Sequence, residues 1–273
     1  MALPHQLVSP IHPARWCLVL HGILGSKTNW RGVVRKVSEA LPEWGFVLPD
    51  LRNHGDAQGY PPPHDLTAVC DDLAALSKYL GHGFDAVLGH SYGSKAALAW
   101  VDRVGGALDR AIIVDGNPGP RPDVRGAETT VRAIEALGSM GTHFDSRDTF
   151  VEGIVSKGFP RDLAQWMAMN LVPDAGRYRL RTDVNAIRSM LDDYFARDYW
   201  PVIENPPGRV RLDVLIGGAS NALNVEERAR VEAAASRSPH RVRCVVIAGA
   251  GHWVHVDRPA ETIRAVIDAL DDA

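Results

Sequence analysis

One serine in the sequence lies in a segment that is typical of enzyme nucleophiles. Residues 89–93 read GHSYG, and this Gly-x-Ser-x-Gly pattern follows the apolar run DAVLG and precedes a helical pattern. A strand-to-helix turn this sharp strains the backbone at Ser91, and the flanking glycines remove the Cβ clashes that would prevent it. The pattern predicts that Ser91 is a nucleophile held at a helix N-terminus. The alternative is a glycine-rich turn in which the serine only caps the next helix.

A base for this serine is predicted near the end of the chain. The segment GAGHW, residues 249–253, places His252 in a glycine-rich loop directly after the last apolar run. The sequence holds 11 histidines, and an arbitrary one is more often a surface or core residue. Because it follows the final apolar run, we predict that His252 takes the proton of Ser91.

A second glycine-containing turn could stabilise the oxyanion that forms when a serine attacks a carbonyl. Two backbone N–H groups aimed at one point serve this purpose. The segment HGILGS, residues 21–26, follows an early apolar run and could supply one of them. We predict that Ile23 in this turn and Tyr92, the residue after the nucleophile, form an oxyanion hole.

Short apolar runs predict a parallel sheet that positions these turns. Each run has four to six residues rich in Val, Ile and Leu without alternation, as strands buried on both faces should have. Helical patterns lie between them, with Asp65 as the N-cap of one helix, a second from Ser94 to Val104 and a third from Pro259 to Leu270. Strands alternating with helices indicate a doubly wound α/β architecture. The runs lie at 16–22, 45–50, 84–90, 110–116, 212–218 and 242–249.

The alternation stops between the fourth and fifth runs. Residues 117–207 show helical stretches and no clear strand, so we predict a helical cap inserted into a core made of residues 1–116 and 208–273. Among its apolar side chains, Trp166, Met167 and Met169 are the candidates for substrate contact. Packing of these side chains inside the cap is the alternative.

The segment DLRNHG, residues 50–55, is predicted to be partly structural. We expect Asp50 and Arg52 to pair and to hold this loop. Asn53 and His54 could reach the rim of a pocket, and a direct catalytic role for His54 is the less favoured reading.

Taken together and in order, these segments resemble a known family. HGILGSKTNW, DLRNHG, GHSYGSK, IVDGNP, LIGGASN and AGHWVHVDRP are similar to the motifs of α/β-hydrolase-fold serine esterases, which include mitochondrial abhydrolase-domain proteins and small bacterial acyl esterases. The resemblance runs nearly end to end. It implies the α/β-hydrolase fold, Ser91 as nucleophile, His252 as base, and hydrolysis of small acyl esters or thioesters without a metal or other cofactor.

The sequence departs from the commonest pattern of this fold at the acid that orients the base. That acid usually follows the next-to-last strand, where this chain has ASNALN. Asp115 is the better candidate because it ends the run RAIIVD, keeps the order Ser91, Asp115, His252, and resembles the family's aspartate-containing turn. The alternatives are Glu226, Glu227, Asp183 and Asp192.

Composition restricts the partners. The formal net charge is −3 and the pI is about 6.4, so the chain lacks the basic character of nucleic-acid-binding proteins. Three widely separated cysteines in apolar runs favour a reducing compartment. The sequence has no long apolar run and no export signal at its start, so we expect a cytoplasmic protein that acts on a small acyl ester away from the membrane. It does not predict the oligomeric state.

Two other functions remain open from the sequence. The same turns would suit a cofactor-free lyase or a carbon–carbon hydrolase on this fold, in which the serine need not be acylated. A non-catalytic protein that binds a small ligand under the cap is the third reading, although binding alone does not require both Ser91 and His252. Serine at the nucleophile position disfavours the dehalogenases and epoxide hydrolases, which use aspartate there.

Overall fold

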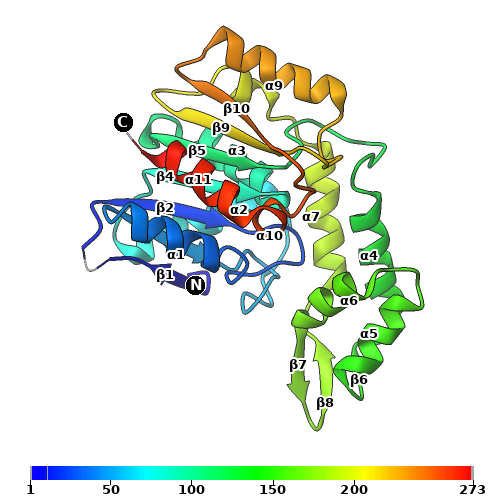
Figure 1. The fold of residues 1–273 in the computed structure, drawn as a ribbon. Helices are drawn as coiled ribbons and strands as arrows, with labels where there is room; N and C mark the ends of the chain where they lie inside the picture. Colours follow the sequence, from blue (N-terminus) through cyan, green and yellow to red (C-terminus); the bar gives the residue numbers. More distant parts are fainter. Residues whose placement is uncertain (1, 11, 272–273) are drawn as a thin grey trace.

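The computed structural model describes residues 2–10 and 12–271, and in that part of the chain seven strands form the central sheet (Figure 1). The strand order is β1-β3-β2-β4-β5-β9-β10, and all neighbours are parallel except the antiparallel pair β1 and β3. The strands are β1 (His5–Val8), β2 (Arg15–Leu20), β3 (Trp44–Pro49), β4 (Ala86–His90), β5 (Arg110–Val114), β9 (Arg211–Gly217) and β10 (Val242–Ile247).

The prediction of an α/β fold with a mostly parallel sheet is confirmed. Each of the six apolar runs contains one strand, from β2 to β10. The predicted helices also form, with Asp65 accepting a 2.7 Å hydrogen bond from the N–H of Ala68 and Pro259 in the first turn of the last helix. The strand β1 was not predicted, because His5–Val8 is a short, half-exposed edge strand without a buried apolar run.

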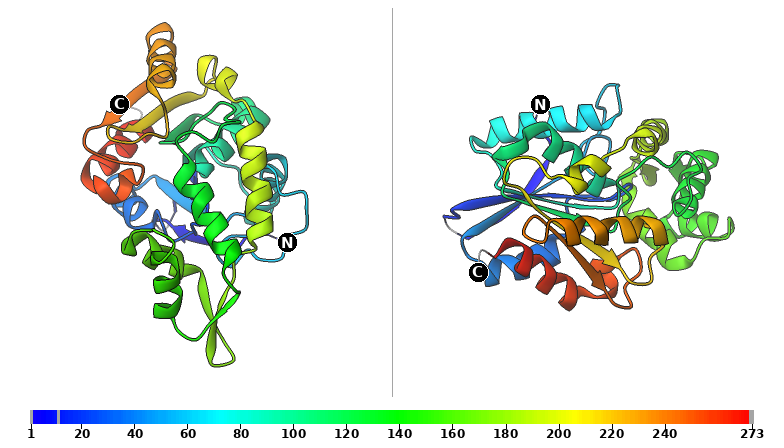
Figure 2. Two further views of the ribbon diagram at one scale, coloured as in Figure 1. Left: turned by 90° about the vertical axis from the view of Figure 1, so that its right-hand side faces the viewer. Right: turned by 90° about the horizontal axis from the view of Figure 1, so that it is seen from above.

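Helices cover both faces of the sheet (Figure 2). Apolar side chains of α2 (Leu66–Leu80), α3 (Tyr92–Val104) and α9 (Val225–Arg237) belong to one buried cluster, and those of α1 (Arg31–Ala40) and α11 (Pro259–Leu270) belong to another. The short helices η1 (Gly105–Ala107) and α10 (Val254–Asp257) lie in the loops between them. The central sheet therefore lies between two layers of packed helices.

Between β5 and β9 the chain leaves the central sheet and forms the cap (Figure 1). Within the cap, α4 and α7 lie side by side (Figure 2). We propose the boundaries 117 and 207 for this unit. Its elements are α4 (Glu128–Ser139), β6 (His143–Phe144), α5 (Arg147–Val155), α6 (Arg161–Met167), η2 (Ala168–Asn170), β7 (Leu171–Asp174), β8 (Arg177–Leu180), α7 (Val184–Ala196) and α8 (Trp200–Glu204).

The cap is mainly helical, as expected, but it also contains strands that were not predicted. The strands β6, β8 and β7 form a small antiparallel sheet in the described part of the cap. These strands have two to four residues, and β8 reads RYRL with two of its side chains exposed. Such short, polar strands lack the apolar run by which the core strands are recognised.

None of the helices in residues 2–10 and 12–271 is both long and apolar enough to cross a membrane.

Candidate active site

Ser91 lies in a strained turn between β4 and α3. Its backbone has φ 56° and ψ −118°, which a non-glycine residue rarely adopts. A Cβ at Gly89 would collide with the carbonyl of Gly93, and a Cβ at Gly93 would collide with the carbonyl of Leu20 on the neighbouring strand β2. The two glycines of the motif therefore permit the close approach that places Ser91 at the edge of a cavity.

The three residues predicted to act together are in hydrogen-bond contact. The Oγ of Ser91 lies 2.9 Å from Nε2 of His252, and Nδ1 of His252 lies 2.7 Å from Oδ2 of Asp115. A carboxylate only accepts hydrogen bonds, so Nδ1 of the neutral ring must donate to Asp115. That tautomer leaves Nε2 free to accept the hydroxyl proton of Ser91.

Asp115 is fully buried, with 0% of its surface exposed, and both of its carboxylate oxygens are hydrogen-bonded. Its Oδ1 accepts the N–H of Gly217 at 2.9 Å, and its Oδ2 also accepts the hydroxyl of Ser220 at 2.6 Å. Its backbone φ of 43° lies in the left-handed region. The loop after β9 thus contributes a serine that contacts the acid, a role that the sequence reading missed.

The alternative carboxylates lie elsewhere. Glu226 and Asp192 are exposed, and Asp183 accepts hydrogen bonds from two backbone N–H groups at the start of α7. Glu227 closes a capping box with Asn224 and pairs with Arg121 at 2.5 Å.

The loop that carries His252 is fixed by its neighbours. The N–H of Gly251 donates to Asp257 at 2.8 Å, and Nε2 of His90 donates to the carbonyl of His252 at 2.9 Å. Burial lowers the pKa of His90 well below its ordinary value, so its ring stays neutral and keeps one N–H for this bond. His90, the second residue of GHSYG, therefore supports the base through the backbone of its loop.

The turn predicted to hold the oxyanion lines the same cavity as Ser91. The N–H of Gly25 donates to the carbonyl of Gly22 at 3.1 Å and closes a four-residue turn around Ile23. His21 lies beneath it: its Nδ1 donates to the carbonyl of Gly22 at 2.7 Å, and its Nε2 accepts the N–H of Leu51 at 3.0 Å. Tyr92, the first residue of α3, also lines the cavity.

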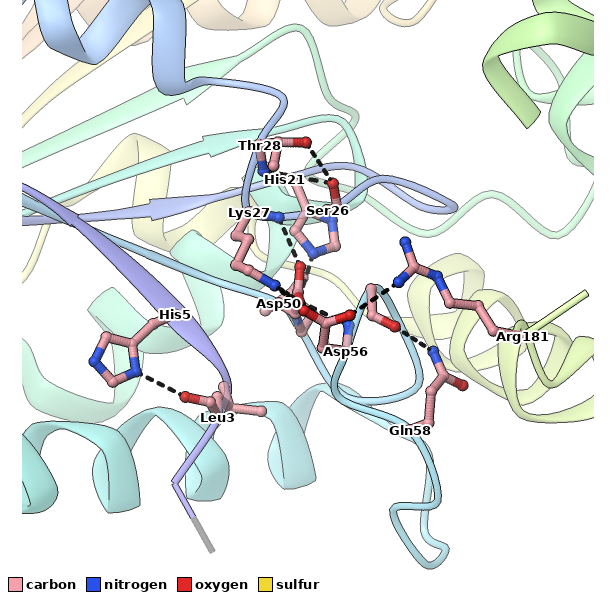
Figure 3. Close-up of polar contacts among 12 residues, drawn as sticks. Leu3, His5, His21, Ser26, Lys27, Thr28, Asp50, Asp56, Gln58 and Arg181 are labelled. Atoms are coloured by element: carbon pink, nitrogen blue, oxygen red, sulfur yellow. Dashed lines mark hydrogen bonds and ion pairs between the residues drawn. The ribbon is translucent and has the colours of Figure 1, made fainter. Parts of the chain in front are cut away.

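A cluster of charges lies next to this turn (Figure 3). Lys27 contacts Asp50 at 2.5 Å and Asp56 at 2.6 Å, and Arg181 of the cap contacts Asp56 at 3.0 Å. The expected pair of Asp50 and Arg52 is wrong, because Arg52 instead binds Asp72 at 2.7 Å. Arg52 lies two residues after Asp50, and its side chain points toward α2, which carries Asp72.

His54, for which a catalytic role was the less favoured reading, is buried and packs against His21 with a ring distance of 5.0 Å. Its Nδ1 donates to the carbonyl of Arg52 at 2.9 Å. Burial, together with the neighbouring His21, lowers the pKa of His54 to about 3. A neutral ring in this position supports the loop beneath the oxyanion turn.

The cavity over Ser91 has a volume of about 290 Å³ and is enclosed partly by the cap. Of the three predicted contact residues, Trp166 lines it and packs edge-to-face on Trp253 at 4.7 Å. Met167 is buried inside the cap, and Met169 is 53% exposed; neither is a lining residue. The sequence does not distinguish the other apolar lining residues of the cap, which are Ala127, Ala133, Leu163, Leu191, Tyr194 and Phe195.

Lys95 attaches the cap to the helix of Ser91. Its ammonium donates to the carbonyls of Gly119, Tyr194 and Arg197 at 2.7, 2.6 and 3.2 Å. Gly119 lies between β5 and α4, and the other two residues lie at the C-terminal end of α7. Lys95 has no exposed surface, and this burial lowers its pKa to about 7.

Comparisons with known proteins agree with this architecture. Residues 17–265 match the model of the alpha/beta hydrolase family. The chain is 26% identical over 254 residues to the sn-1-specific diacylglycerol lipase ABHD11 of Mus musculus, covering 92% of this chain and 79% of that protein. It is 25% identical over 262 residues to the esterase YbfF of Escherichia coli, covering 93% and 92% of the two chains.

A solved structure of a marine microorganism esterase has the same fold, with a TM-score of 0.81, 22% identity, and coverage of 98% of this chain and 99% of that chain. The resemblance inferred from the motifs is confirmed by the family match and by these relatives. The chain therefore belongs to the α/β-hydrolase family.

Proposed function

We propose that this protein is a serine carboxylesterase that hydrolyses small acyl esters or thioesters through an acyl-enzyme on Ser91. The observation that carries the proposal is the hydrogen-bonded series from Ser91 through His252 to the buried Asp115, with Ser91 at the edge of a cavity. The esterase and lipase names of the relatives support the same reaction class.

Acylation follows from the positions of these groups. The Oγ of Ser91 attacks the ester carbonyl carbon while Nε2 of His252 takes the hydroxyl proton. The carbonyl oxygen becomes an oxyanion, and the N–H groups of Ile23 and Tyr92 stabilise it. When the tetrahedral intermediate collapses, the bond to the alcohol or thiol breaks and His252 gives its proton to the leaving group. An acyl ester on Ser91 remains.

Deacylation uses the same residues in reverse. A water molecule attacks the acyl carbon as Nε2 of His252 takes one of its protons. The second tetrahedral intermediate collapses, the bond between the acyl carbon and Oγ breaks, and His252 returns the proton to Ser91. The products are the carboxylic acid and the free enzyme, and neither step requires a metal or an organic cofactor.

Asp115 acts through the imidazole. Its carboxylate accepts the Nδ1–H of His252 and so favours the tautomer in which Nε2 is basic. Its negative charge also stabilises the imidazolium that forms in each step. The hydrogen bonds from Gly217 and Ser220 hold the carboxylate in place while it does so.

We propose that the acyl chain lies against the apolar wall that the cap contributes. Leu163, Trp166 and Leu191 lie on this wall, whereas Asn29, Asn221 and Glu128 line other parts of the same cavity. Among the three side chains predicted from the sequence, this assigns substrate contact to Trp166.

We also propose a reducing, cytoplasmic compartment. Cys17, Cys70 and Cys244 are all free thiols, and burial raises the pKa of each.

The Ser91→Ala variant tests the proposal. Its kcat on a panel of p-nitrophenyl esters and acyl-CoA thioesters should fall by about 10³-fold or more, because only binding and the oxyanion hole remain. Circular dichroism should show an unchanged fold. Retention of most of the turnover in a folded Ser91→Ala variant would remove Ser91 as the nucleophile and favour a reaction without an acyl-enzyme.

A further inference from the structure

The oxyanion turn contains a residue in an unfavourable backbone conformation. Leu24 has φ 59°, in the left-handed region that favours glycine. It follows Ile23 directly, and its backbone dihedrals set the relative orientation of the two peptide groups that flank it. A leucine persists in this region only where surrounding contacts hold it there.

The core holds one side of this turn. The carbonyl of Gly22 accepts hydrogen bonds from the N–H of Gly25 and from Nδ1 of His21. Both donors lie within the same loop or directly before it.

The cap holds the other side. Nδ2 of Asn170 donates to the carbonyl of Leu24 at 3.1 Å, across 146 positions of sequence. Asn170 is the last residue of η2 and is 6% exposed. Its own carbonyl accepts the N–H of Arg181 at 3.0 Å, which fixes Asn170 at the base of the β7–β8 hairpin. The bond to Leu24 is therefore directional, buried and anchored on both sides.

A second contact between cap and loop runs through charges (Figure 3). Arg181, whose N–H holds Asn170, places its guanidinium 3.0 Å from Asp56. Asp56 binds Lys27 at 2.6 Å, and Lys27 also binds the buried Asp50. Lys27 lies three residues after Leu24, so Asn170 contacts this loop directly and Arg181 reaches it through Asp56.

We propose that Asn170 is a positioning residue, by which the docked cap holds the turn of residues 22–25 in the conformation that aims the N–H of Ile23 at the oxyanion. The ion pairs Arg181–Asp56 and Lys27–Asp56 stabilise the same contact between the cap and the loop. This inference rests on the proposed function, in which an oxyanion forms when Ser91 attacks the ester carbonyl. It gives the cap a part in the chemical step that is separate from its contact with the acyl chain.

The test compares Asn170→Leu, which removes the donor at similar size, with Gln165→Leu, which makes a similar change at an exposed position of α6. Turnover is measured with p-nitrophenyl acetate and p-nitrophenyl octanoate. Asn170→Leu should lower kcat about tenfold or more, which is less than the 10²–10³-fold loss of a whole oxyanion donor. The factor should be the same for both esters, with KM changed less than about threefold, and Gln165→Leu should match the wild type.

A loss that grows with acyl-chain length, or a raised KM at unchanged kcat, would overturn the proposal, because either result would mean that Asn170 shapes the acyl pocket. Unchanged kinetics in folded Asn170→Leu would overturn it as well.

Amide hydrogen exchange tests the contact without turnover. Peptides that cover residues 22–27 should exchange faster in Asn170→Leu and, to a smaller extent, in Arg181→Met, whereas Gln165→Leu should leave them unchanged. Should Asn170→Leu fail to fold, Arg181→Met makes this measurement alone, and wild-type exchange in that variant would contradict the inference. Because exchange requires no ester, an absence of esterase activity in the wild type would refute the proposed function while leaving the contact between cap and turn still measurable.

Discussion

In the core, the turn that carries Ser91 is set by backbone atoms, whereas the cavity wall in the cap is set by side chains. Ser91 stands where it does because Gly89, Gly93 and Leu20 pack backbone against backbone. The cavity wall in the cap depends instead on Trp166 against Trp253 and on Lys95 bound to backbone carbonyls of the cap. The nucleophile thus lies in a turn where an added Cβ would collide with backbone, whereas the cap wall depends on which side chains pack there.

The largest expected effect comes from a charge in the core. Asp115→Asn should lower kcat by up to about 10⁴-fold, because the amide brings no charge and allows the unproductive tautomer of His252. Glu226→Gln, at an exposed position, should cost about tenfold or less. Both are measured at one pH with circular dichroism as the folding control. A near-normal kcat in Asp115→Asn together with a collapse in Glu226→Gln would move the acid to α9.

A methyl group in the core turn should cost stability. Gly93→Ala places a Cβ against the carbonyls of Leu20 and His21, for a loss of about 1–3 kcal/mol or more in the free energy of unfolding. Gly32→Ala is the matched control, because a Cβ there meets no atom within 4 Å and alanine favours the helix α1 by about 0.5–1 kcal/mol. Urea unfolding measures both. Equal stability of the two variants would show that the turn can relax.

Lys95, which attaches the cap, should make the free energy of unfolding depend on pH. Burial lowers the pKa of Lys95 to about 7, so above that pH the folded protein releases a proton that the unfolded chain keeps until about pH 10. The unfolded state then binds more protons, and the free energy of unfolding should rise with pH by up to about 1.4 kcal/mol per unit across this window from Lys95. Urea titrations at pH 7, 8 and 9 should show a smaller slope in Lys95→Met than in the exposed control Lys78→Met. Identical slopes in Lys95→Met and Lys78→Met would contradict this assignment to Lys95.

The smallest expected effect is the dependence of kcat/KM on the length of the acyl chain. Each methylene buried on the cap wall should favour binding by up to about 0.8 kcal/mol, so kcat/KM should increase from acetyl to octanoyl esters. Trp166→Ala should flatten that increase, and Met169→Ala should not, because Met169 is 53% exposed and does not line the cavity. The same chain-length series on all three proteins decides this. A flat series in the wild type would count against an apolar acyl pocket.

The sequence predicted the core better than the cap, because backbone packing restricts the residue types of the core. Strands buried on both faces and turns that exclude a Cβ leave residue types that can be read directly, and so the six strands, Ser91, Asp115 and His252 were found in the positions that the structure brings together. Ser220 was missed as a partner of Asp115, because a serine in a loop carries no pattern of its own.

In the cap, the sequence identified apolar side chains but did not predict the direction in which each of them points. Trp166, Met167 and Met169 lie close together in sequence, yet one lines the cavity, one is buried and one is exposed. They span the end of α6 and the tighter turn of η2, and Trp166 is oriented by packing on Trp253, which is distant in sequence. Periodicity does not predict orientation across such a junction.

The central claim is that Ser91 carries the acyl group, and covalent labelling followed by mass spectrometry tests it most directly. A fluorophosphonate, or a slowly hydrolysed p-nitrophenyl ester quenched in acid, should add one mass equivalent to the peptide that contains Ser91. Ser91→Ala should remain unlabelled under the same conditions. Modification of a different serine, or rapid ester turnover by a wild-type protein that forms no adduct at Ser91, would contradict the account.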